Sequence, residues 1–128
     1  MEATMTGAGA TWAWWEARRL RYNLGLGLAG WIAYGLALAL GIVFGQPLWS
    51  SWQLGFSITI LLGAGFLVLI VCANICYLAG AAMEALVCPS DPLAFRTSAY
   101  WLGFWGSAAV PFLFPLVVLA SLLATRLP

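Results

Sequence analysis

The apolar run from Phe56 to Val87 constrains the fold of this chain more than any other feature. The run is FSITILLGAGFLVLIVCANICYLAGAAMEALV, and Glu84 is its only charged residue. A helix rises about 1.5 Å per residue, so roughly 20 apolar residues cross the hydrocarbon core of a bilayer. This run exceeds that length. It predicts a transmembrane helix, which we place at residues 56–80.

The composition of the whole chain indicates the same class of protein. Of the 128 residues, 64% are hydrophobic and 7% are charged, and the mean hydropathy is +0.99. Soluble domains carry about 25% charged residues, so this composition argues strongly against a water-soluble fold. The length suits a single domain, residues 1–128. We therefore expect one all-α membrane domain with three transmembrane helices.

Charge and residue usage narrow the possible partners. The net charge of +1 provides no overall field that would attract nucleic acid. The chain contains no His and no Lys, so the commonest metal and haem ligand is missing. We expect no nucleic-acid partner, no cofactor and no metal. The expected partners are the lipid bilayer and other membrane helices, either of a second copy or of another protein.

The first 22 residues divide into two parts. Residues 1–10 are small and polar and predict a disordered lead-in. Residues 11–22, TWAWWEARRLRY, combine tryptophans with arginines, and both favour the headgroup layer of a bilayer. We predict an interfacial helix over 11–22, with Thr11 as its cap. The same mixture can stack on single-stranded nucleic acid, but its position directly before an apolar span favours the membrane.

The first predicted span covers residues 23–44 and is rich in glycine. Small and polar residues recur along it every three or four positions: Asn23, Gly27, Gly30, Tyr34, Ala37 and Gly41. These positions form one stripe along a helix. Glycine lets two helices approach closely in lipid, and neither Gly nor Asn gains from contact with lipid tails. We expect this stripe to face another helix.

Two breaks separate the three spans. Residues 45–55 carry no charge and include Pro47, so they predict a short connection and an antiparallel pairing of spans one and two. Its tryptophans, Trp49 and Trp52, favour the second interface. Residues 88–92, CPSDP, predict a turn in which Pro89 and Pro92 interrupt any helix.

The third predicted span covers residues 99–124. Ala99, Gly103 and Ser107 form an edge of small residues, and Pro111 and Pro115 follow at the same spacing. Proline lacks the N–H that a helix needs, so Pro111 frees the carbonyl of Ser107, and Pro115 frees that of Pro111. We expect a kink here, with other groups bonding to the freed carbonyls.

The arginines predict the orientation. Four of them lie on one side of a three-span arrangement: Arg18, Arg19, Arg21 and Arg96. Only Arg126 lies on the other side. Cytoplasmic loops are enriched in Arg and Lys, so we expect the N-terminus in the cytoplasm, the C-terminus outside, and these four arginines as anchors on the cytoplasmic side.

A second polar stripe runs along the middle span and includes Asn74, Tyr77 and Glu84. One interpretation is a polar path in which Glu84 carries a proton or a cation. The expected depth of Glu84 in the bilayer favours a different interpretation, in which Glu84 forms an ion pair. If the hydrocarbon begins near Phe56, it ends near Tyr77, and Glu84 lies about 10 Å beyond. There it can pair with Arg96 or with the arginines of residues 18–21. Asn74 lies deeper, where such residues bond to a neighbouring helix.

The three cysteines indicate no chemistry. Cys72 and Cys76 lie one helical turn apart, and no carboxylate, His or Lys is placed to activate them. A thiol in apolar surroundings is inert. Together with Cys88 they provide three thiols at different depths, whereas zinc needs four ligands. We expect no catalytic residues, no metal site and no enzymatic activity.

Three sequence patterns of this chain, taken together, carry a resemblance to known proteins. They are Trp15-Glu16-x-Arg18-Arg19-x-Arg21-Tyr22-Asn23, then Asn74-x-x-Tyr77-x-x-Gly80-x-x-x-Glu84, and finally Gly103-Phe104-Trp105-x-Ser107 with Pro111-Phe112-x-x-Pro115. In these patterns, which cover nearly the whole chain, the sequence resembles a loose group of small, uncharacterised bacterial inner-membrane proteins. The resemblance implies a shared three-span fold and a bacterial inner-membrane location. It implies no activity and no site residues.

Each predicted span carries a small or polar stripe, and three helices cannot easily bury all of these stripes among themselves. We therefore expect a non-catalytic protein that acts through helix–helix association, as a homo-oligomer or as an accessory subunit of a membrane complex. The alternative is a small oligomeric transporter or channel, with a polar path near Asn74 and the kink at Pro111 and Pro115. Broken helices with exposed carbonyls line such paths.

Overall fold

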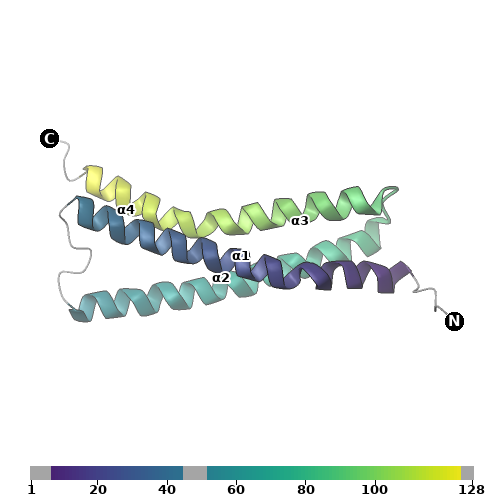
Figure 1. Cartoon of the computed structure of the whole chain (residues 1–128), viewed down its shortest axis with the longest axis horizontal. Helices are drawn as coiled ribbons and strands as arrows, with labels where there is room; N and C mark the ends of the chain where they lie inside the picture. Colours follow the sequence, from purple (N-terminus) through teal and green to yellow (C-terminus); the bar gives the residue numbers. More distant parts are fainter. Residues whose placement is uncertain (1–6, 45–51, 125–128) are drawn as a thin grey trace.

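The computed structural model describes residues 7–44 and 52–124, and every regular element in these ranges is a helix (Figure 1). The elements are α1 (Gly7–Val43), α2 (Trp52–Val87), α3 (Pro92–Ala109), the 3-10 turn η1 (Val110–Phe112) and α4 (Leu113–Ala124). Three stretches of these residues are long and apolar enough to cross a membrane: Gly9–Val43, Gly55–Val87 and Pro92–Ala124. The expected all-α fold, with three helices long and apolar enough to span a membrane, is confirmed.

Helix α1 begins earlier than expected and has no break. Residues 7–10 are helical, which corrects the expected disordered lead-in for those positions, and residues 1–6 lie outside the described ranges. The side chain of Thr11 bonds to α2 and α3, so the first turns of α1 have tertiary support. The predicted interfacial helix 11–22 and the predicted span 23–44 belong to one continuous helix.

The third span also begins earlier than the predicted residue 99. Asp91 caps α3, because its Oδ1 accepts from the backbone N–H groups of Leu93 and Ala94 at 3.1 and 3.0 Å. Pro92 is then the first helical residue, where a missing N–H costs nothing. The expectation that Pro92 interrupts the helix was therefore wrong. Two other expectations, the connection through Pro47 and Trp49 and the position of Arg126, fall outside the described residues.

The turn between α2 and α3 forces one residue into an unusual backbone conformation. Cys88 precedes Pro89, and a residue before proline is disfavoured in the helical region. Helix α2 ends at Val87, and Cys88 has a φ of 46° in the left-handed region. Its N–H still donates to the carbonyl of Glu84 at 3.1 Å. The turn is thus short and returns α3 directly alongside α2.

The expected break at Pro111 is the turn η1, where Figure 1 shows α3 and α4 meeting at an angle. The carbonyl of Ser107, freed by Pro111, accepts instead from the N–H of Val110. The carbonyl of Pro111 accepts from the N–H of Leu113. The same N–H of Leu113 also donates to the carbonyl of Val110, which is the 3-10 bond. Local backbone N–H groups therefore contact the acceptors that the prolines release.

The core has two parts, and α2 belongs to only one of them. Near the α2–α3 turn, all three long helices contribute: Trp15, Tyr22, Leu26, Ala73, Tyr77, Ala81 and Ala108. Near the other end, only α1 and α4 contribute: Ala37, Val118 and Leu122. Between residues 55 and 72 of α2 no side chain is buried, and α2 and α4 barely contact each other. The first half of α2 diverges from the bundle in Figure 1.

We predict that Cys88→Gly will stabilise the protein by up to about 1 kcal/mol, because glycine adopts the left-handed conformation without a Cβ clash. Cys88→Ala retains the Cβ and should show no such gain. Reversible unfolding in mixed micelles, followed by circular dichroism, measures the difference. An equal response of the two variants would mean that this turn stores no backbone strain.

Candidate functional site

One ion pair joins α2 to α3 beside their connecting turn. The Nε atom of Arg96 donates to both carboxylate oxygens of Glu84, at 2.8 and 2.9 Å, and its Nη2 donates to Oε1 at 2.6 Å. The Glu84 side chain is 5% exposed and the Arg96 side chain 16%. Glu84 lies in the last turn of α2, where the helix dipole disfavours a negative charge. Arg96, one of the two partners suggested by the sequence, supplies the compensating positive charge.

Two side chains of α1 complete the surroundings of Glu84. The Thr11 hydroxyl donates to Oε1 at 3.0 Å and accepts from Nη2 of Arg96 at 2.9 Å. The indole Nε1 of Trp15 donates to Oε2 at 3.1 Å. Both oxygens of Glu84 are therefore bonded to donors, which is the condition for tolerating a buried charge. Sequence reasoning assigned Thr11 to a helix cap and Trp15 to a membrane interface, and it missed both contacts.

Two tyrosines extend the polar contacts toward the middle of the bundle. The Tyr77 hydroxyl donates to the backbone carbonyl of Trp15. The Tyr22 hydroxyl lies 3.0 Å from Oγ of Ser107 and donates toward the carbonyl of Ala73 at 3.3 Å. Tyr22 therefore links α1 to α2 and α3 at once, and it is one of the two largest fully buried side chains. Tyr77 and Ser107 were candidates from the sequence, whereas Tyr22 was not.

Asn23 and Asn74 form a reciprocal amide pair between α1 and α2. The Nδ2 of Asn74 donates to Oδ1 of Asn23 at 2.7 Å, and the Nδ2 of Asn23 donates to Oδ1 of Asn74 at 3.3 Å. Each amide also donates to its own helix, Asn23 to the carbonyl of Arg19 and Asn74 to that of Ile70. This is the interhelical bond expected of Asn74, and such bonds contribute on the order of 1 kcal/mol.

The buried face of α1 shares Ala37 and Gly41 with the predicted stripe but differs from it nearer the N-terminus. Its buried residues follow a heptad pattern: Trp15, Tyr22, Leu26, Ala33, Ala37 and Gly41. A Cβ at Gly30 would lie 2.4 Å from the ring of Phe66, so Gly30 does pack against α2. A Cβ at Gly27 or Gly103 would meet no atom within 4 Å. The spacing of seven between Trp15 and Tyr22 was the signal that could have identified this face.

The four arginines expected on one side do lie at one end of the bundle. The guanidinium of Arg18 lies 3.9 Å from the ring centroid of Trp14, a cation–π contact. Arg19 pairs with Glu16 at 3.4 Å on an exposed surface, and Arg21 is exposed. Arg96 instead points inward to Glu84, so it contributes to packing more than to surface anchoring.

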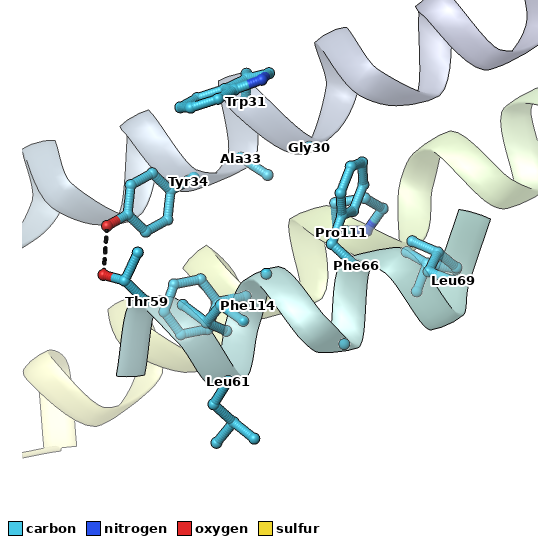
Figure 2. Close-up of a pocket in the computed structure, with 14 residues that line it drawn as sticks. Gly30, Trp31, Ala33, Tyr34, Thr59, Leu61, Phe66, Leu69, Pro111 and Phe114 are labelled. Atoms are coloured by element: carbon cyan, nitrogen blue, oxygen red, sulfur yellow. Dashed lines mark hydrogen bonds between the residues drawn. The ribbon is translucent and has the colours of Figure 1, made fainter. Parts of the chain in front are cut away.

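A groove opens where α2 leaves the bundle. It has a volume of about 370 Å³ and is lined by residues of α1, α2, η1 and α4 (Figure 2). At one end the hydroxyls of Tyr34 and Thr59 form a hydrogen bond of 3.0 Å across it. Pro111 lies on its wall. The structure thus brings two of the candidate residues, Tyr34 and Pro111, to one groove, while Asn74 does not line it. Pro115 is buried in α4.

The polar cluster has the chemistry of a structural clamp. Its carboxylate is saturated by donors, and the described residues contain no group of three or more His, Cys, Asp or Glu that could hold a metal ion. Cys72, Cys76 and Cys88 are exposed and unbridged. Comparisons with protein-family models, curated proteins and solved structures found no match. The functional argument therefore rests on the geometry of the chain itself.

We predict that Glu84→Leu and Arg96→Met will each lower the free energy of unfolding by about 3 kcal/mol, because each leaves a buried charge without its partner. The double variant removes both charges and should cost less than the sum of the single effects. Unfolding in mixed micelles measures these values.

The exposed pair of Glu16 and Arg19 provides the matched control. Glu16→Leu and Arg19→Met should each change the free energy of unfolding by less than about 1 kcal/mol, because exposed ion pairs contribute little. Strictly additive effects of the Glu84 and Arg96 substitutions would contradict a coupled buried pair.

Proposed function

We propose that this chain is a non-catalytic integral membrane protein that acts by associating with another transmembrane helix, of a second copy or of a larger complex. The observation that carries the proposal is the exposure of the first half of α2. Residues 55–72 contain no buried side chain, although they belong to Gly55–Val87, the most apolar of the three candidate spans. A helix that contributes so little to its own bundle is available to another.

The polar groups of the bundle are engaged within the chain. The ion pair, the tyrosine hydroxyls and the amide pair all bond to groups of α1, α2 or α3. The association that we propose therefore depends on packing of apolar and small side chains, which is how helices associate in lipid. The face of α2 opposite the groove supplies them, with exposed residues at helical spacing: Ile60, Ala64, Leu67, Val71 and Ile75. We call these five residues the outer face of α2.

A small residue at the centre of this face favours close approach. Ala64 is exposed between two larger side chains of the outer face. A second helix backbone can therefore come near α2 at this level without displacing any side chain of the chain itself.

The proposed setting is the bacterial inner membrane, with the N-terminus in the cytoplasm. Four arginines gathered at one end of the bundle support this orientation. The resemblance to small three-span proteins of that membrane supports the location. In this setting the end that holds the Glu84–Arg96 pair faces the cytoplasm, and the groove lies toward the opposite leaflet.

We predict that Ala64→Trp will abolish or strongly reduce assembly, because the indole occupies the space that a second helix backbone needs. Chemical crosslinking in membranes and native electrophoresis in mild detergent measure assembly. Ala39→Trp, at an exposed position on α1, is the matched control and should assemble like the parent protein. A parent chain that is strictly monomeric and brings no other protein with it through purification would count against the proposal.

The alternative is an oligomeric transporter or channel with a path near Asn74 and the Pro111 turn. The geometry favours it less, because the Asn74 amide bonds to Asn23 and Ile70 rather than facing an open space. Pro111 does line the groove. We predict that Asn74→Leu will weaken the α1–α2 contact by about 1 kcal/mol and leave ion flux through reconstituted vesicles unchanged. Loss of a measurable flux with intact assembly would favour the transporter.

A further inference from the structure

We propose that the groove between α1, α2 and α4 is a binding site for one acyl chain of a membrane lipid, drawn from the leaflet farther from the Glu84–Arg96 pair. This goes beyond the proposed association, which uses the opposite face of α2. The groove lies between helices of membrane-spanning length, is only partly enclosed, and lies in the region where α2 and α4 barely contact each other. Bilayer lipid therefore has direct access to it.

The walls suit a hydrocarbon chain. Apart from the pair of hydroxyls at one end, the side chains that face the groove are apolar or aromatic. Phe66 extends from α2 toward Gly30 and closes the space between those helices (Figure 2). Pro111 and Phe114 form the wall on the η1–α4 side. An empty space of this size inside a bilayer would forfeit the contacts of its whole lining.

The length of the groove matches one leaflet. Its lining on α2 runs from Thr59 to Leu69. Ten residues of helix rise about 15 Å, which is half of the hydrocarbon core of about 30 Å. An acyl chain that enters at the Thr59 end would therefore reach the midplane of the bilayer at the Leu69 end.

The groove is only partly enclosed, so an occupant can enter it from the side. An extended chain of methylene groups is the narrow component that the bilayer itself provides.

The polar end of the groove lies where a lipid is polar. Counted from Tyr77, which lies beside the Glu84–Arg96 pair, about 20 residues of α2 cross the hydrocarbon and end near Ser57. The hydroxyls of Thr59 and Tyr34, 3.0 Å apart, then lie within a turn of that boundary. The Thr59 hydroxyl donates to the carbonyl of Gly55 at 2.9 Å, so the Tyr34 hydroxyl donates to Thr59. This polar pair lies at the level of the ester groups of a lipid.

The test is lipid retention by the full chain. The protein is reconstituted in bilayers of phosphatidylethanolamine and phosphatidylglycerol, extracted into mild detergent, freed of loose lipid by gel filtration and weighed intact by native mass spectrometry. We expect one retained lipid per chain. Gly63→Leu places a side chain into the open space of the groove without meeting any atom within 4 Å at its Cβ, so this variant should lose the lipid.

Gly35→Leu is the matched control, because Gly35 also has open space at its Cβ position but does not line the groove. It should retain the lipid. Equal retention by both variants, or no retained lipid in the parent chain, would overturn the proposal. A parent chain that is a dimer and becomes a monomer with Gly63→Leu would assign the groove to a second copy instead, and would also overturn it.

A second measurement does not depend on any variant folding correctly. The reconstitution is repeated with phosphatidylcholine that carries a diazirine in one acyl chain, and the protein is irradiated after gel filtration. Labelling should concentrate on groove residues such as Leu62 and Phe66, and should spare Leu67 and Val71 on the outer face. Labelling that is equal on both faces of α2 would contradict a single bound chain.

Discussion

The buried ion pair of Glu84 and Arg96 is the interaction on which the arrangement of the helices depends. A carboxylate 5% exposed is tolerated only when donors surround it, and here the donors come from both α1 and α3. The contact therefore specifies more than one helix pair. It sets the rotation of α2 and α3 about their short turn, and it holds the first turns of α1 against both. Trp15 and Tyr77, with rings 5.2 Å apart, then fill the space below it.

The consequence is a bundle that is closed at one end and open at the other. Beyond the amide pair of Asn23 and Asn74, α1 turns its buried face to α4, and the second part of the core excludes α2. Farther along, toward the α1–α2 connection, the hydroxyls of Tyr34 and Thr59 form a hydrogen bond between α1 and α2. Among the described residues it is the one side-chain hydrogen bond between these helices beyond the amide pair. Phe66 against Gly30 sets the spacing of the two helices there. The groove and the bare outer face of α2 are two sides of this same divergence.

Much of this fold was predictable, because length and hydropathy suffice to place apolar spans. The depth argument for Glu84 also named Arg96 as one of two possible partners, since the predicted topology places Arg96 and the arginines of residues 18–21 on the same side. The rest depended on tertiary context. Tryptophan is typical of a membrane interface, but the indole N–H of Trp15 donates to Glu84. Pro92 has the signature of a helix breaker, yet Asp91 makes it a helix start. The groove arises from divergence of α2, and no residue pattern encodes an interhelical angle.

The length of α2 relates this divergence to the thickness of the bilayer. Its uncharged part from Phe56 to Met83 rises about 42 Å, while the hydrocarbon core measures about 30 Å. A helix longer than the layer it crosses relieves hydrophobic mismatch by tilting. Because α2 is fastened at its carboxyl-terminal end, its other half can change tilt without disturbing the ion pair. Bilayer thickness is thus a variable to which the open half of the bundle can respond while the closed half keeps its shape.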